Sequence, residues 1–123
     1  MLLFSDARFF RVVEELSGCP PIARLTGGVY RMEPDPRHFV DWHGDLGESS
    51  RVLTMTVNLG DAAVRGGEFE IKRLGAETPL ACIPYENGGD AILFRLAPDL
   101  RHRSAPVGGT VAKTIFSCWF HAS

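Results

Sequence analysis

The 123-residue chain has the length of a single domain, which can bury a core without disulfides or a structural metal. Its 13 lysine and arginine residues against 15 aspartate and glutamate residues give a formal net charge of -2, and no basic run is present, so we expect no nucleic-acid partner. No apolar run reaches membrane-spanning length and no secretory leader pattern opens the sequence, so we expect a cytoplasmic protein without a membrane partner.

The first predicted element is one amphipathic helix. Apolar residues recur at helical spacing between Ser5, a candidate N-cap, and Gly18, a candidate stop before Pro20 and Pro21. Beyond the prolines, short β-rich runs alternate with glycine, proline and aspartate clusters. The expected strands lie near 24–33, 38–45, 51–59, 67–73, 79–84, 90–96, 101–105 and 111–120.

These elements predict an all-β fold with one N-terminal helix. About eight short strands without a second helix favour a jelly roll or sandwich of two antiparallel sheets, with the helix supporting one sheet. No repeat, linker or low-complexity segment divides the chain, so residues 1–123 are predicted to form a single domain. The odd cysteine count argues against a disulfide framework, and wide spacing argues against a zinc knuckle.

The residues that indicate a metal site are His43, Asp45 and His102. Two histidines and one carboxylate are the facial ligand set of non-haem Fe(II) oxygenases, and residues two apart on a strand share a face. In an unbroken strand His38 faces away from His43, and His121 near the C-terminus is predicted to lie at the surface. Taken alone, the His43-Gly44-Asp45 motif also fits an exposed edge strand that carries polar residues for solubility.

Longer segments carry a resemblance to a known family. The runs 41–45, 51–59 and 66–71, and then Pro84, 91–94, His102, Lys113 and Trp119, follow the order seen in the 2-oxoglutarate and Fe(II)-dependent oxygenase superfamily, in its prolyl 4-hydroxylase-like branch. The resemblance covers roughly residues 28 to 120 and implies a double-stranded β-helix, the jelly roll of cupin-like proteins.

The resemblance implies a role for each site residue. His43, Asp45 and His102 would be the iron ligands, and Lys113 would pair with the distal carboxylate of 2-oxoglutarate, where the family more often has arginine. Lys113 also lies amid apolar residues of a strand that the pattern predicts to be buried on both faces, and there a lysine needs an anion. The alternative is an edge strand on which Lys113 extends to water.

The sequence departs from the family pattern at Asn58, a position where the family often has tyrosine. One hydrogen bond to the co-substrate carboxylate is then lost or rebuilt, and Tyr30, Thr54 or Thr56 are candidate sources of a hydroxyl. We therefore expect Lys113, Tyr30, Asn58 and Thr54 near the co-substrate. Tyr30 fits equally well as an ordinary β-sheet aromatic.

The predicted function is a dioxygenase that uses Fe(II), 2-oxoglutarate and O2 to hydroxylate an amino acid, a peptidyl residue or another small metabolite. Asp45 favours oxygenation over halogenation, because the related halogenating class lacks this carboxylate. Two alternatives remain open: a cupin-like metal protein that does not use 2-oxoglutarate, and a non-catalytic jelly-roll binding module. The chain is short beside many hydroxylases of this type, so a homodimer that supplies missing supporting parts is also predicted.

Overall fold

A computed structural model describes residues 4–47 and 50–123. Helix α1 (Ala7–Ser17) begins after Asp6, whose side chain accepts a 2.7 Å hydrogen bond from the Arg8 amide, so the N-cap is Asp6 and not the expected Ser5. The helix ends at Gly18, as predicted, because glycine adopts the left-handed conformation required there, with φ at 67°.

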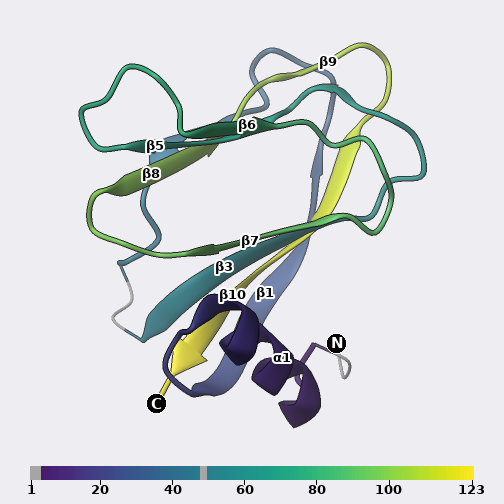
Figure 1. The fold of residues 1–123 in the computed structure, drawn as a ribbon. Coiled ribbons are helices and arrows are strands. Elements are labelled where there is room, and N and C mark those ends of the chain that lie inside the picture. The colour runs from purple at the N-terminus through teal and green to yellow at the C-terminus, as the bar shows by residue number, and fades with distance from the viewer. Residues whose placement is uncertain (1–3, 48–49) are drawn as a thin grey trace.

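Two four-stranded antiparallel sheets form the body of the described chain. The first has the order β1 (Ile22–Met32), β10 (Lys113–Ala122), β3 (Arg51–Asn58) and β7 (Ala91–Arg95). The second has the order β2 (Val40–His43), β8 (Leu100–Ser104), β5 (Phe69–Arg73) and β6 (Ala81–Ile83), and a short pair joins β4 (Arg65–Gly66) to β9 (Val107–Gly108). The sheets face each other and α1 lies beyond the first sheet (Figure 1), which confirms the predicted fold class.

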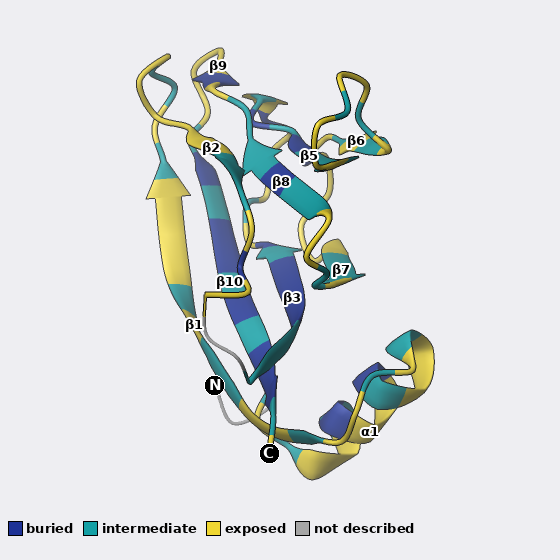
Figure 2. Cartoon of the chain, turned by 90° about the vertical axis from the view of Figure 1, so that its left-hand side faces the viewer, coloured by how far each residue is buried: buried dark blue, intermediate teal, exposed yellow. Residues whose placement is uncertain are grey.

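Strand β10 is the element on which the core is built. Phe116, Cys118 and Phe120 alternate onto one face and pack in a cluster with Phe10 and Val13 of α1. The intervening residues face the second sheet, where Ile115 joins another buried cluster between the two layers. Strands β3 and β10 are accordingly mostly buried, whereas the edge strand β1 is largely exposed (Figure 2).

The expected strands are found, with three differences. The short pair β4–β9 was not predicted, and β2 ends at His43 with an irregular register, so Val40 and His43 line the same cavity instead of facing opposite sides. Strand β10 continues past residue 120, pairing Ala122 with Ile22 and His121 with Arg51. The prediction of a surface His121 is therefore wrong: the residue is fully buried, because its strand lies between two others.

Within the described residues, α1 does not have the length and hydrophobicity needed to cross a membrane.

Candidate functional site

His43, Asp45 and His102 meet at one end of the space between the sheets. His43 ends β2, Asp45 follows it in the loop, and His102 lies opposite His43 on β8. One ligand atom from each residue lies within 4.8 Å of the others. Asp45 Oδ1 is 3.4 Å from His43 Nε2, and Asp45 Oδ2 is 3.2 Å from His102 Nε2. Two imidazoles and one carboxylate thus converge on a volume that suits one ion.

Hydrogen bonds orient these side chains from behind. The Asp41 carbonyl lies 2.7 Å from His43 Nδ1, which turns Nε2 toward the centre of the cluster. Asp45 Oδ2 accepts from Thr54 Oγ1 at 3.2 Å and from Trp119 Nε1 at 2.9 Å. Such outer partners fix ligand orientation in metal sites.

Arg51 supports the same arrangement from one side. Its guanidinium carbon lies 4.4 Å from the centre of the Trp119 ring, and its Nη1 donates to the Asp45 carbonyl at 3.3 Å. The contacts tie the strand that carries Trp119 to the loop that carries Asp45.

The electrostatics of the cluster favour an ionised carboxylate. Burial alone would raise the pKa of Asp45, but hydrogen bonds from His102, His43 and Trp119 hold it well below its usual range. The hydrogen bond to Asp45 raises the pKa of His43. The carboxylate therefore keeps a negative charge beside the two imidazoles, an arrangement that suits a bound cation.

A cavity of about 310 Å³ opens from this cluster between the two sheets. Thr54 and Trp119 lie beside the cluster, and Thr56, Tyr85, Ser104 and Ile115 also line the cavity. The register explains the row of side chains, because Trp119 pairs with Thr54 and Ser117 pairs with Thr56 across the first sheet. The mouth includes Tyr30 and Val40, which are both exposed.

Lys113 lies beside the residues that line the cavity away from the cluster, and its side chain is fully buried. Its ammonium donates to the Gly67 carbonyl at 2.8 Å and to Ser104 Oγ at 3.1 Å, and it lies 4.3 Å from the centre of the Tyr85 ring. Burial lowers the pKa of Lys113 to about 8, although the charge of Glu68 opposes this change. No carboxylate forms an ion pair with Lys113 among residues 4–47 and 50–123.

The other predicted co-substrate residues are scattered. Tyr30 lines the mouth and is 49% exposed, and Thr54 contacts Asp45 rather than Lys113. The Asn58 side chain is buried, but it donates to the Asn87 carbonyl at 2.9 Å and accepts from the Gly60 amide at 3.0 Å. Asn58 thus holds a loop together, and the structure does not bring it into the cavity lining.

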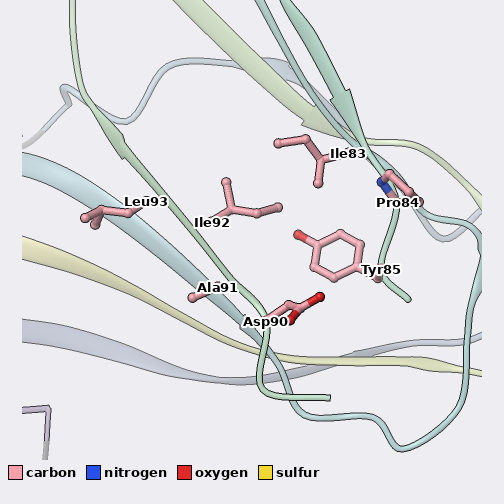
Figure 3. A pocket seen from close by; sticks show the side chains of 7 residues that line it. All are labelled: Ile83, Pro84, Tyr85, Asp90, Ala91, Ile92 and Leu93. Carbon is pink, nitrogen blue, oxygen red and sulfur yellow. The ribbon is translucent and has the colours of Figure 1, made fainter. Parts of the chain in front are cut away.

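Two residues of the site were missed by the sequence reasoning. Trp119 was matched only as part of a family pattern, although its two-residue alternation with Lys113 already put both on one face. Tyr85 had no signal, because it follows the short strand β6 in a loop. Tyr85 also borders a second cavity of about 410 Å³, where its ring lies among Ile83, Ile92 and Asp90 (Figure 3).

Comparison with known proteins identifies the family of this chain. A family model described as the 2OG-Fe(II) oxygenase superfamily matches residues 27–121. The chain belongs to this superfamily. No curated protein matches the sequence.

Solved structures of the superfamily share the fold. A Burkholderia pseudomallei oxidoreductase of the 2OG-Fe(II) oxygenase family has a TM-score of 0.76 at 23% identity, with coverage of 98% of this chain and 54% of that one. A Phytophthora capsici prolyl 4-hydroxylase has a TM-score of 0.77 at 16% identity, covering 98% and 41%. A Trichoplax adhaerens prolyl hydroxylase, solved with a hypoxia-inducible-factor peptide fragment, has a TM-score of 0.72 at 14% identity, covering 90% and 51%.

These likenesses confirm the jelly-roll fold of the superfamily member. The chain spans about half the length of the solved relatives it matches.

Proposed function

We propose that this chain acts as an Fe(II)- and 2-oxoglutarate-dependent hydroxylase on a small molecule or a peptide. One observation carries the proposal. His43, Asp45 and His102 converge at one end of the cavity, and at the other end the buried ammonium of Lys113 contacts Ser104, which lines the cavity. The first group matches a metal that keeps open positions, and the second matches a co-substrate with a distal carboxylate.

The residues present fit the metal. His43, Asp45 and His102 would hold Fe(II), since two neutral imidazoles and one ionised carboxylate form the ligand set of non-haem iron oxygenases. When bound, iron together with 2-oxoglutarate and O2 supplies the oxidising power that an unactivated C–H bond requires. The short distances between Asp45 and both histidines would then be replaced by bonds to one cation.

Aromatic rings cover the His102 side of the metal end. Phe94 meets the His102 ring edge-on with centroids 4.9 Å apart, and Phe69 stacks against the same ring with centroids 5.8 Å apart. An apolar wall around the imidazole strengthens electrostatic interactions inside the cavity and protects reactive species. The chain therefore orients its ligands through hydrogen bonds and shields His102 with aromatic rings.

Lys113 would bind the distal carboxylate of 2-oxoglutarate. Its ammonium forms no ion pair with a carboxylate of the described residues, and a buried charge gains most from a partner of opposite sign. The Gly67 carbonyl and Ser104 hydroxyl orient the ammonium without cancelling its charge. We further propose a cytoplasmic setting, which would keep iron ferrous, and a homodimer that completes the supporting structure.

The proposal is tested by binding and turnover under controlled oxygen. The wild-type chain is expected to bind Fe(II) anaerobically and to convert 2-oxoglutarate to succinate when O2 is admitted. Asp45→Ala should abolish both, whereas His38→Ala, which changes an exposed histidine outside the cluster, should leave both unchanged. Lys113→Ala should keep metal binding and lose 2-oxoglutarate binding. A wild-type chain that binds metal but does not bind or consume 2-oxoglutarate would contradict the proposal and favour a cupin-like metal protein.

A further inference from the structure

Strand β1 is the longest open edge of the two four-stranded sheets, within the part of the chain that the structure describes. It has 11 residues and pairs with β10 on one side, whereas the other edge strands β7, β2 and β6 have 5, 4 and 3 residues. Figure 2 shows β1 at the outside of the first sheet, exposed along much of its length. A long open edge offers a row of backbone donors and acceptors to another strand.

The hydrogen-bond pattern identifies the residues of β1 whose backbone points outward. The Leu59 amide donates to the Thr114 carbonyl at 3.0 Å, so the even-numbered residues of β10 bond to β3 and its odd-numbered residues bond to β1. Ile115 of β10 pairs with Tyr30, so the even-numbered residues of β1 face β10. The outward N–H and C=O groups therefore belong to Leu25, Gly27, Val29 and Arg31.

Little in this part of β1 protects its edge from pairing. Natural edges are commonly protected by lysine, proline or a β-bulge. The register shift of β1 against β10 lies before residue 25, and residues 25–32 contain neither lysine nor proline. Arg31 is already paired with Glu33 at 2.8 Å. Val29 is 65% exposed and Tyr30 is 49% exposed, so two large side chains lie uncovered beside the open backbone.

The run from Gly27 to Arg31 is complementary to itself when two copies lie antiparallel with Val29 on the two-fold axis. Val29 then faces Val29 of the second copy, and both present outward backbone groups. Tyr30 faces Gly28 of that copy. Arg31 faces Gly27. Each larger side chain thus meets a glycine, and a β-branched pair, which packs well across strands, lies at the centre.

Gly28 is not required by the fold of its own chain. Its φ is not left-handed, and the nearest atoms to an added Cβ belong to the Tyr30 side chain at 3.8 to 3.9 Å, an ordinary contact distance. Gly27 differs, because an added Cβ there would collide with the Ser117 carbonyl. A strand that meets its own copy explains a glycine at position 28, whereas an unrelated peptide strand does not need one. The second copy is therefore the occupant that the sequence favours.

The Tyr30 ring links this edge to the cavity. The ring leans over Gly28 of its own strand, so two copies paired at Val29 bring their Tyr30 rings side by side across the axis. An aromatic ring beside a strand glycine covers the backbone that glycine leaves open. Tyr30 also lines the cavity mouth, so the ring of each copy adjoins the mouth of the other.

We propose that a second copy of this chain binds along β1, antiparallel about a two-fold axis at Val29, and that each copy contributes Tyr30 to the cavity mouth of the other. The first sheets of both copies then form one continuous sheet, and every contact occurs twice. The inference defines the interface of the homodimer in the proposed function, and it rests on that function only for the meaning of the cavity.

Charge substitutions at Val29 test the register, because a residue on the two-fold axis meets itself. Val29→Lys and Val29→Glu each place like charges opposite one another, so each variant alone should associate at least about tenfold more weakly than the wild type. An equimolar mixture pairs lysine with glutamate and should regain the wild-type affinity. Sedimentation equilibrium at low ionic strength measures all three samples. Single variants that remain dimeric, or a mixture that associates no better than either variant, would overturn the proposal.

Proline substitutions test the open edge without a change of charge. Val29→Pro removes an N–H that points away from β10, so it should give a folded monomer, with folding checked by circular dichroism. Arg95→Pro is the matched control on the open edge of β7, where the outward N–H belongs to Arg95 because the next residue, Leu96, bonds to Val52. Arg95→Pro should dimerise as the wild type does. Equal loss of association in the two variants would count against the β1 edge.

The association measurements use the chain without iron and without 2-oxoglutarate, so their outcome does not depend on the chemistry of the site. A wild-type chain that stays monomeric up to its solubility limit would overturn this interface and leave the hydroxylase assignment standing. A dimer that responds to the Val29 variants as expected, in a chain that does not bind 2-oxoglutarate, would support the interface and overturn the hydroxylase assignment alone.

Discussion

The indole of Trp119 donates a 2.9 Å hydrogen bond to Oδ2 of Asp45, the oxygen that also accepts from Thr54. Two donors on one oxygen leave Oδ1, which faces His43, as the oxygen better placed to bind a metal through a single bond. Trp119 therefore determines which face of the carboxylate a metal meets.

Trp119→Phe should lower metal affinity about tenfold, because loss of an outer hydrogen bond lets the Asp45 carboxylate rotate. Competition between the protein and a coloured chelator for Mn(II) measures the change. The matched control is Trp42→Phe, since the Trp42 ring lies 4.3 Å from Lys72 Nζ and 4.9 Å from the Arg103 guanidinium carbon. Equal affinities in the two variants would show that the indole N–H of Trp119 does not orient the ligand.

The affinity for 2-oxoglutarate should depend on pH through Lys113. The ammonium is the form that binds a carboxylate, and burial lowers the pKa of Lys113 to about 8. As pH rises through this value the free protein loses the charge, so affinity should fall by up to tenfold per pH unit above it. Calorimetric titrations between pH 7 and pH 10 give the profile.

Lys113→Arg is the control for this profile, because arginine keeps its charge throughout that range. Its affinity should stay level with pH, whatever its absolute value. A fall of the same steepness in Lys113→Arg would assign the pH dependence to another group.

Gly67→Ala should weaken both folding and 2-oxoglutarate binding. Gly67 has a φ of 63°, and an added Cβ would lie 3.1 Å from Lys113 Cδ and 3.0 Å from Val107 Cγ2. Gly75→Ala is the matched control, since its φ is 81° but nothing lies within 4 Å of an added Cβ. Both variants lose about 1 kcal/mol through the left-handed backbone, and Gly67→Ala should lose about 1 to 2 kcal/mol more through crowding.

Urea unfolding measures the stability of the two glycine variants, and titration with 2-oxoglutarate measures binding. Only Gly67→Ala should bind the co-substrate more weakly. The Gly67 carbonyl accepts a hydrogen bond from the Lys113 ammonium, and the added Cβ would press on the Lys113 side chain. If Gly75→Ala shows the same loss of binding, general destabilisation and not Lys113 displacement is the cause.

His121→Ala should destabilise the fold without affecting the metal cluster. The buried imidazole lies 2.8 Å from Thr26 Oγ1 and 2.8 Å from Ser50 Oγ, so its removal leaves a cavity and takes one hydrogen-bond partner from each hydroxyl. We expect a loss of about 2 to 3 kcal/mol in the free energy of unfolding, measured in urea. His38→Ala, at an exposed histidine, should change stability by less than about 0.5 kcal/mol. A large loss of Mn(II) affinity in folded His121→Ala would contradict a purely structural role.

The features of the site that can be predicted from the sequence are those set by the alternation of residues along a single strand. The burial of Lys113 follows from alternation along a strand with apolar neighbours on both faces. His121 was misjudged because a position near the C-terminus says nothing about whether the strand is central. Asp45 lies beyond the end of β2, so the argument from an unbroken strand does not explain its position. Its contact with Trp119 depends on how a loop meets a strand 74 residues away.

The contribution of Tyr85 could not be predicted from pattern. The residue follows a three-residue strand, and its ring reaches Lys113 only because the second sheet folds over the first. Asn58 shows the opposite case, in which a position matched by family order is used to hold a loop. The roles of Tyr85 and Asn58 depend on contacts between loops and strands that are far apart in the sequence, and the periodicity of short segments does not predict such contacts.

Lys113 and Trp119 belong to the same unbroken strand, six positions apart on one face. The separation between the two ends of the cavity is therefore a property of backbone rise, roughly 3.3 Å per residue, and not of side-chain choice. Inserting a single residue between them would turn the lysine to the helix side while leaving the indole in place. An engineer who wants this protein to accept a longer or shorter oxo acid should leave the spacing of β10 alone and change the side chains at its far end.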